Sequence, residues 1–386
     1  MLSNSVVAIC ITVCTRLQIS FWRPIRCLEF SVTDSLSKCV WGWSLRIGAD
    51  ETSPCYCCNR KAQFLAESTN TIERFAADPI EKRAMQALMA RSDGPGLRQA
   101  GLHFALIGCT GVLVVFALES WWLWPAMLLH GQGLVFLFAA EHETAHRTAF
   151  KSRWLNELVI WIAGLVVLLS PSYYRAFHFA HHRHTQDREY DPELHFKKVD
   201  RWSGYLLYMS GLTYWKAAIV NMLRAMIGRA EAPFIGPRDR ALIVRDSRIM
   251  ATIYVAAGAS ALWLGPWLLY LWVVPMVLAQ PFERMWIIAE HTGCDQTSDP
   301  TTADMFRNTR TTRMNCVMRF LTWNMGYHAE HHAFPAVPFH ALKELHVLVG
   351  HQVETQARAY WTFHTGWWRL VRQNARRRDA VVTSGR

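Results

Sequence analysis

Apolar residues are gathered into long blocks, and four of these blocks are long enough to cross a membrane. An α-helix rises about 1.5 Å per residue, so roughly 17 to 25 apolar residues span the hydrocarbon core of a bilayer. The sequence predicts spans at 102–118, 122–140, 249–264 and 266–289. Because only short turns separate the first from the second and the third from the fourth, we expect two transmembrane hairpins.

Basic residues are distributed unevenly around these hairpins. The two predicted turns, ESWW and LGP, contain no Lys or Arg, whereas the segments between and around the hairpins contain many. Since positively charged residues are retained on the cytoplasmic side of a membrane, the long loops and both termini are expected in the cytoplasm. The predicted fold class is all-α: an integral membrane protein with four transmembrane helices in two hairpins and a cytoplasmic helical cap.

Two further apolar runs, 154–170 and 205–223, are expected to lie in the membrane interface. A full crossing by the first run would place the His-rich segments before and after it on opposite faces of the membrane. The alternative for either run is an ordinary core helix of the cytosolic part.

Composition supports a membrane location. Hydrophobic residues make up 51% of the 386 positions and charged residues only 18%, which is unusual for a soluble protein. The formal net charge of +11 could suggest nucleic acid, but the Lys and Arg are interleaved with Trp and apolar stretches. We therefore expect no nucleic-acid partner, because this mixture suits a surface of anionic lipids better.

The N-terminal part differs from the rest of the chain. Seven of the ten cysteines precede residue 60, and residues 1–84 lack clear periodicity. We expect 1–84 to be an extension that is poorly ordered or results from too early a start codon. The membrane domain is then 85–386.

Histidine has the clearest pattern of any residue type, because nine of the 17 fall into four groups. HETAH contains an i, i+4 pair, FHFAHH and YHAEHH each contain an i, i+3, i+4 set, and AEHTG contains one more. Residues three and four apart share a helix face, so each set is expected to project its rings in one direction. The nine are His142, His146, His178, His181, His182, His291, His328, His331 and His332.

This number of histidines indicates more than one metal ion. A tetrahedral zinc takes four ligands, and a catalytic zinc usually takes three from the protein. Imidazole also binds iron, copper and nickel, so ligand type alone does not identify the metal. HETAH by itself also fits the HExxH pattern of zinc proteases, with His142 and His146 as ligands and Glu143 as base. That alternative leaves the later clusters without a role.

Residues near the clusters have predicted supporting roles. Carboxylates can orient metal-binding imidazoles by accepting their second N–H, and the candidates are Glu141, Glu143, Asp187, Asp191, Glu290 and Glu330. His184 lies off the helix face of its neighbours and is expected at the surface or as an outer partner. His103 and His130, in the first hairpin, are expected to form hydrogen bonds between helices.

The three boxes HETAH, HFAHH and HAEHH resemble, in order and separation, those of the membrane fatty acid desaturase and hydroxylase superfamily. EHTG resembles an additional motif of alkane hydroxylases, and DREYDPE and FPAVPFHAL are similar to segments of bacterial desaturases. The resemblance covers about residues 100–350. It implies a bacterial inner-membrane enzyme in which the eight box histidines bind two non-haem irons, with His291 as a ninth ligand and no separate catalytic residue.

The resemblance implies an O2-dependent desaturase that introduces a double bond into a lipid acyl chain. The alternatives are a hydroxylase or ketolase of a carotenoid, alkane or other hydrophobic substrate, and a desaturase of a small metabolite such as dihydrorhizobitoxine. Many acyl-CoA desaturases have four residues between the histidines of the first box, and this chain has three. The chain contains neither HPGG nor paired CxxC sets, so we expect a separate ferredoxin, rubredoxin or cytochrome to supply electrons.

Overall fold

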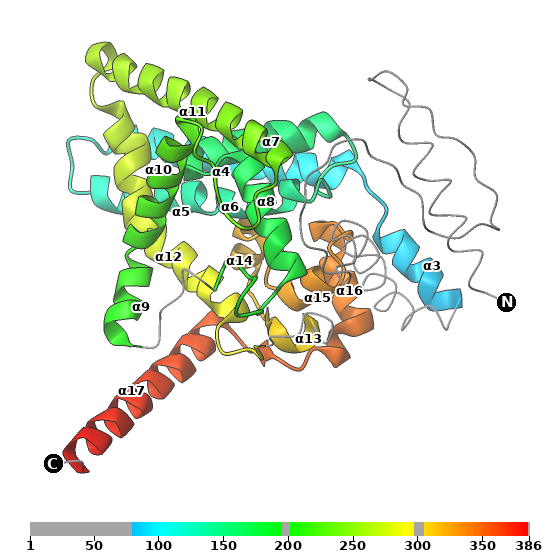
Figure 1. Cartoon of the computed structure of the whole chain (residues 1–386). Helices are drawn as coiled ribbons and strands as arrows, with labels where there is room; N and C mark the ends of the chain where they lie inside the picture. The colour runs from blue at the N-terminus through cyan, green and yellow to red at the C-terminus, as the bar shows by residue number, and fades with distance from the viewer. Residues whose placement is uncertain (1–78, 195–200, 297–304, 385–386) are drawn as a thin grey trace, which may run out of the picture. The chain divides into compact units, whose positions relative to one another are not determined.

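The computed structural model describes residues 79–194, 201–296 and 305–384 (Figure 1). The predicted extension 1–84 lies almost wholly outside the described residues, so the boundary at residue 85 stays a prediction. The first half of the described chain is helical, and its elements are α3 (Pro79–Leu88), α4 (Asp93–Phe116), α5 (Leu123–Val135), α6 (Leu137–Ala145), α7 (Arg153–Val167), α8 (Pro171–Arg183), α9 (Trp202–Met209) and α10 (Leu212–Met226).

The second half contains three long helices, α11, α12 and α17, with short elements between them. They are α11 (Pro237–Leu264), the π-helix η1 (Leu269–Val273), α12 (Val274–His291), α13 (Met305–Asn308), β1 (Thr311–Thr312), α14 (Cys316–Leu321), α15 (His328–Ala333), the 3-10 turn η3 (Phe339–Ala341), α16 (Leu342–Val349), the 3-10 turn η4 (Gly350–Gln352), β2 (Gln356–Ala357) and α17 (Tyr360–Ser384). The one departure from an all-α fold among these described elements is the parallel pair β1–β2.

Three segments of the described chain are long and apolar enough to cross a membrane: α4, the combined α5–α6 segment (Leu123–Ala145), and α11. They coincide with most of the first two predicted spans, 102–118 and 122–140, and contain the third, 249–264. The fourth predicted span, 266–289, is not among them. It falls on η1 and α12, and α12 contains the charged residues Glu283, Arg284 and Glu290. Glu283 and Arg284 form a buried ion pair with Oε2–Nε at 2.5 Å.

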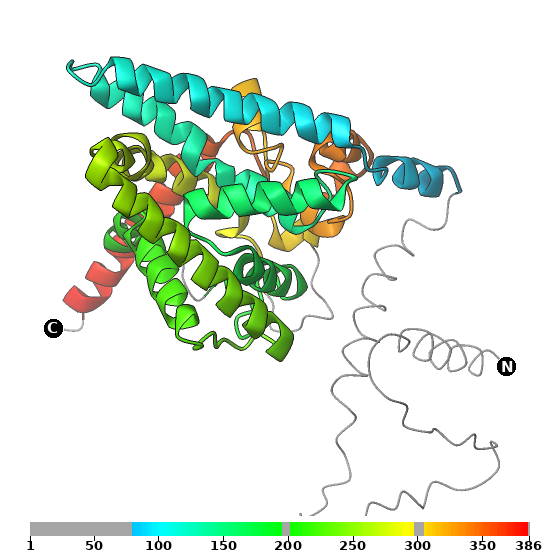
Figure 2. The ribbon, with the colours of Figure 1, turned by 90° about the horizontal axis from the view of Figure 1, so that it is seen from above.

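The first two spans form the predicted hairpin, and polar contacts tie them together and to η1. In Figure 2, α4 and α5 lie side by side along much of their length. The ring of His103 on α4 hydrogen-bonds through Nε2 to the Gly133 carbonyl at 2.9 Å. His130 on α5 contacts Thr110 Oγ1 at 2.9 Å and the Leu271 carbonyl at 3.0 Å. The predicted interhelical role of both histidines is confirmed.

The 154–170 run ends in a sharp bend. Helices α7 and α8 meet at 95°, so together they form either a broken span or a re-entrant segment. Leu168 adopts a left-handed conformation with φ of 60°, which ends α7. Ser170 then caps α8 by accepting a hydrogen bond from the Tyr173 amide, and Pro171 occupies the first helical turn. The bend turns the histidines of α8 toward the end of α6.

Helices α9 and α10 expose apolar side chains on one face. Tyr205, Tyr208 and Ala218 are buried, whereas exposed side chains follow the other side of the pair, namely Leu206, Leu207, Leu212, Ile219, Val220 and Leu223. This face is suited to the hydrocarbon boundary of a bilayer. The interfacial location of 154–170 and 205–223 stays a prediction.

Helices α5 and α12 approach closely where α5 has a glycine. A Cβ atom added at Gly131 would overlap the Pro275 carbonyl oxygen and lie 2.7 Å from the Cβ of Ala279. The absence of a side chain therefore permits this backbone contact, which brings the ends of α6 and α12 into the same region.

We expect Gly131→Ala to destabilise the protein by about 1–3 kcal/mol, because the added methyl group must push α12 away. The matched control is Gly101→Ala on α4, where an added Cβ has nothing within 4 Å. Thermal unfolding in detergent measures both. Equal melting temperatures for the two variants would contradict the close packing of α5 against α12.

Candidate metal centre

Nine histidines from four helix regions converge in the structure. His142 and His146 stand at the C-terminal end of α6, and His291 is the last residue of α12. The other six lie on α8 and α15, which are short helices with three histidines each. Seven of the nine rings are buried, and His146 and His182 are intermediate. Segments separated by more than a hundred residues thus contribute to one site.

The nine divide into two groups. In each group the nitrogens that each ring can offer to a metal lie within 4.8 Å of one another. The two groups are adjacent, because His182 of one and His332 of the other stack with ring centroids 4.0 Å apart. The five-histidine group is His142, His146, His178, His182 and His331, and the four-histidine group is His181, His291, His328 and His332.

The division separates neighbouring histidines within each HxxHH motif. On α8, the i, i+4 pair His178 and His182 joins the five-histidine group, and His181 joins the other. On α15, His328 and His332 stay together, and His331 joins the five-histidine group. Consecutive helical residues point about 100° apart because a turn takes 3.6 residues. The expectation that each set projects in a single direction was therefore wrong.

Within each group, ring nitrogens face one another at distances suited to ligands of one ion. The Nε2 atoms of His146 and His178 are 2.7 Å apart. The Nε2 atom of His291 lies 3.1 Å from that of His181 and 3.1 Å from that of His328. Two nitrogens bound at about 2.1 Å and at right angles to one another are about 3.0 Å apart.

In the four-histidine group, the partners of the outer nitrogens determine where the protons are. His181 Nδ1 lies 2.9 Å from Asp191 Oδ1, and His291 Nδ1 lies 3.3 Å from the Asn308 carbonyl. Both oxygens only accept, so in a neutral ring Nδ1 is protonated and Nε2 presents a lone pair. His181 and His291 therefore turn lone pairs toward each other, which is unfavourable unless a cation lies between them.

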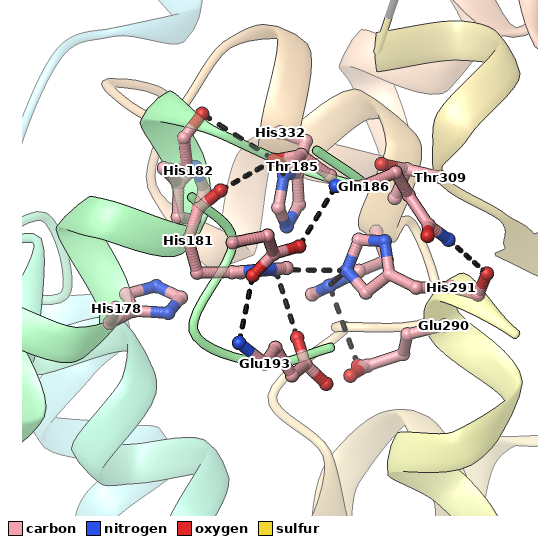
Figure 3. Close-up of polar contacts among 12 residues, drawn as sticks. His178, His181, His182, Thr185, Gln186, Glu193, Glu290, His291, Thr309 and His332 are labelled. Atoms are coloured by element: carbon pink, nitrogen blue, oxygen red, sulfur yellow. Dashed lines mark hydrogen bonds and ion pairs between the residues drawn. The ribbon is translucent and has the colours of Figure 1, made fainter. Parts of the chain in front are cut away.

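His332 has the same arrangement, as Figure 3 shows for its contact with Thr185. The Thr185 hydroxyl donates to the His181 carbonyl at 2.8 Å, so it accepts a hydrogen bond from His332 Nδ1 at 3.1 Å. His328 turns its Nδ1 toward Glu290 Oε1 at 3.4 Å. All four rings thus direct Nε2 toward a common point.

Several ring nitrogens within the two histidine groups have no hydrogen-bond partner among the described residues. They are the Nε2 atoms of His142, His182, His331 and His332. Leaving a buried polar group unpaired costs about 1–3 kcal/mol, so four such atoms in one place require an explanation. A pair of bound metal ions fits the donor set, because each ion would accept the lone pairs of one group.

Burial keeps the rings of α15 in the form that binds metal. It lowers the pKa of His328, His331 and His332 well below the ordinary value, and neighbouring histidines lower each pKa further. A neutral imidazole is the ligand form, whereas an imidazolium has no lone pair to donate. These three side chains are therefore uncharged at neutral pH.

Three of the predicted carboxylates lie beside the histidines. Glu143 Oε1 is 3.8 Å from Nδ1 of both His142 and His331. Its other oxygen accepts a hydrogen bond from the Phe339 amide at 3.2 Å. Asp191 and Glu290 face His181 and His328, as described above. These carboxylates are positioned to orient the rings.

The other three predicted carboxylates have different surroundings. Glu330 bonds His346 and Thr311. Asp187 accepts the backbone N–H groups of Glu189 and Tyr190. Glu141 is fully buried, and neither carboxylate oxygen has a hydrogen-bond partner among the described residues. His184 joins neither group, as predicted from its position on the helix.

Sequence reasoning missed two residues at the site. Thr185 contacts His332, and its position four residues after His181 could have indicated that it shares a helix face with that histidine. Glu193 Oε2 lies 3.1 Å from His181 Nε2. Its place in the DREYDPE segment, two residues after Asp191, was the available signal.

A cavity of about 170 Å³ opens beside the histidines. The rings of His142, His178, His181 and His328 reach its wall. The rest of the lining is mostly aromatic and aliphatic and comes from α8, α10, α11 and α12, including Tyr174, Phe177, Tyr214, Ala218, Met250 and Ile287. An apolar chain bound here would lie against both histidine groups.

Known proteins resemble this chain over much of its length. Residues 119–364 match the sequence profile of a family described as fatty acid desaturase. The chain is 25% identical over 290 residues to dihydrorhizobitoxine desaturase of Bradyrhizobium elkanii. This match covers 68% of this chain and 77% of that protein.

Two proteins that are both described as sn-1 oleoyl-lipid 12-desaturase are also similar to this chain. The chain is 27% identical over 128 residues to the protein of Picosynechococcus sp., a match that covers 31% of this chain and 36% of the relative. With the protein of Arthrospira platensis it shares 21% identity over 241 residues, or 59% and 68% of the two chains. The chain thus spans about a third of the length of the first of these relatives and about two thirds of the second.

We expect Thr185→Val to weaken metal binding about 10- to 100-fold, because it removes the acceptor that orients His332. The control is Thr322→Val, since Thr322 is also buried and its hydroxyl donates to a carbonyl four residues earlier, that of Met318. Titration of metal-free protein against a competing chelator measures the affinity. If both variants bind metal as the wild type does, Thr185 does not orient a ligand.

Proposed function

The chain belongs to the fatty acid desaturase family, and we propose that it is an O2-dependent membrane desaturase that introduces a double bond into a lipid acyl chain. The proposal rests above all on one observation: nine histidines form two adjacent groups beside an apolar cavity. Each group would hold one non-haem iron, since iron accepts imidazole ligands.

The irons would supply the oxidising chemistry that amino-acid side chains lack. An unactivated methylene has no acidic proton for a base to remove, and a bound iron pair supplies the oxidation of such a C–H bond by O2. The protein has three tasks. Its histidines hold the metals, Asp191 and Thr185 fix the ring orientations, and the aromatic cavity excludes water and aligns the chain. We propose no catalytic residue apart from the nine ligands.

We propose four membrane spans in two hairpins, with α12 and η1 forming the fourth. His142 near the C-terminal end of α6 and His291 at the end of α12 lie in one site, so the second segments of both hairpins end on the same side. That side carries basic residues such as Arg147 and Arg183, which supports a cytoplasmic location in a bacterial inner membrane. Electrons would come from a separate ferredoxin, rubredoxin or cytochrome.

A second candidate is desaturation of a small specialised metabolite. The relative from Bradyrhizobium elkanii matches more of this chain than either of the two proteins described as lipid desaturases above does. The cavity also contains polar side chains, among them Asn221 and Ser247, that could bind a polar group of a small substrate. A hydroxylase or ketolase of a hydrophobic substrate would use the same metals, and the alignment of the substrate would decide between the reactions.

The zinc-protease alternative receives less support from the geometry. A general base must be free to reach the metal-bound water. The carboxylate of Glu143 instead lies between two imidazoles and accepts hydrogen bonds from Phe339 and Thr148. One zinc would also leave most of the nine histidines without a ligand role.

Metal analysis is the first test. We expect about two irons per chain in purified protein, in line with the two groups, and loss of at least one iron in His331→Ala. The control is His351→Ala, because His351 is exposed and belongs to neither group. One zinc and no iron in the wild type would favour the protease and contradict the proposal.

Product analysis tests the substrate. Expression in a desaturase-deficient bacterium is expected to create a double bond in membrane acyl chains, and His331→Ala is expected to abolish it. New hydroxylated or ketone products would indicate the related oxidations. Unchanged lipids with an altered small metabolite would support the second candidate instead.

A bulky side chain in the cavity is expected to block substrate binding without changing the iron content of the protein. Ala218 is 6% exposed and lines the cavity, so Ala218→Phe is expected to lower turnover about tenfold or more with iron content unchanged. The control is Val220→Phe, on the same helix but outside the cavity lining, with 41% of Val220 exposed. Equal turnover in both variants would mean that substrate binds elsewhere.

A further inference from the structure

The two histidine groups offer unequal numbers of nitrogens, five in one and four in the other. A carboxylate stands next to the smaller group. Glu193 Oε2 lies 3.1 Å from His181 Nε2, the nitrogen that faces His291 (Figure 3). Glu193 is therefore adjacent to the metal-facing side of the ring, whereas Asp191 occupies the outer side.

The contact between His181 and Glu193 is unsuited to an ordinary hydrogen bond. A neutral imidazole has one N–H, and in His181 that hydrogen is used by the contact of Nδ1 with Asp191 at 2.9 Å. The Nε2 lone pair then faces a carboxylate oxygen that also carries lone pairs. A cation between the two atoms would turn this repulsion into attraction.

The distances around His181 Nε2 support shared coordination. Its separation from Glu193 Oε2 equals its separation from His291 Nε2, 3.1 Å in both cases. Oxygen and nitrogen ligands bound at about 2.0–2.2 Å and at right angles are about 3 Å apart. The carboxylate oxygen thus stands where a neighbouring ligand of the same ion would stand.

The loop after α8 holds Glu193 in this position. The Glu193 amide donates to Asp191 Oδ1 at 2.9 Å, and the Gln186 amide donates to Asp191 Oδ2 at 2.8 Å. One carboxylate, that of Asp191, therefore fixes both the ring of His181 and the backbone of Glu193. Glu193 is also part of the cavity wall, where the ion would meet substrate.

We infer that Glu193 is the fifth protein ligand of the metal ion held by His181, His291, His328 and His332. The inference rests on the proposed function, because it requires that this group holds an iron. Each ion would then have five protein ligands, but one set would be neutral and the other would include an anion. Carboxylate and imidazole together are an established combination for non-haem iron.

Spectroscopy of iron-57-loaded full-length protein tests the inference. We expect two Mössbauer signals in the wild type, and in Glu193→Gln a shift of one signal with the other unchanged. The same variant is expected to release one of its two irons to a chelator at about tenfold lower chelator concentration or less. Glu193→Asp retains a carboxylate on a shorter side chain, so the affected signal is expected to lie between those of wild type and Glu193→Gln.

The control is Glu189→Gln, because Glu189 belongs to the same loop and is exposed. Wild-type spectra for both Glu193 variants, or equal shifts of both signals, would overturn the ligand role. If Glu193→Gln does not fold, Glu193→Asp decides by the same comparison. A wild-type protein that binds no iron pair would instead refute the proposed function, which distinguishes the two failures.

Discussion

The site depends on one electrostatic requirement: several uncharged imidazoles must direct lone pairs at the same point. Each ring can do so only if its other nitrogen has a hydrogen-bond acceptor and if the ring stays unprotonated. Asp191, Asn308 and Thr185 provide acceptors in the four-histidine group. For His328, His331 and His332, burial satisfies the second condition by disfavouring the charged form of the ring.

The helical framework meets this requirement by bringing helix ends together. Gly131 allows α12 to pack closely on α5, so α6 and α12 deliver histidines to one region. The 95° bend before α8 turns a third set toward them. Apolar surface on the long helices and on α10 faces outward, as expected for contact with lipid. The same arrangement leaves an apolar cavity against the histidines, so metal holding and substrate alignment would share their walls.

Family membership indicates the type of reaction, whereas the cavity lining would determine the substrate and the carbon atom that reacts. Desaturation and hydroxylation would use one metal centre, and the lining of the cavity would determine which carbon approaches it. The relatives include proteins described as lipid desaturases and one described as a desaturase of dihydrorhizobitoxine. Substrate choice would therefore depend on side chains such as Ala218 and Asn221, which line the cavity and lie outside the histidine motifs.

The sequence by itself identified the nine histidines that the structure brings together, because their spacing set them apart from the other histidines. It also predicted three apolar segments long enough to cross a membrane and the hydrogen bonds of His103 and His130 between helices, because these follow from local hydropathy and position. Only the tertiary structure decided how the nine divide. His181 and His182 are neighbours in sequence but belong to different groups, since a helix turns about 100° per residue and each ring meets partners from other helices. The same holds for the contacts of Thr185 with His332 and of Glu193 with His181, which only the folded chain shows. The fourth predicted span stays a prediction, and only the folded chain shows that Glu283 and Arg284 within it form a buried ion pair.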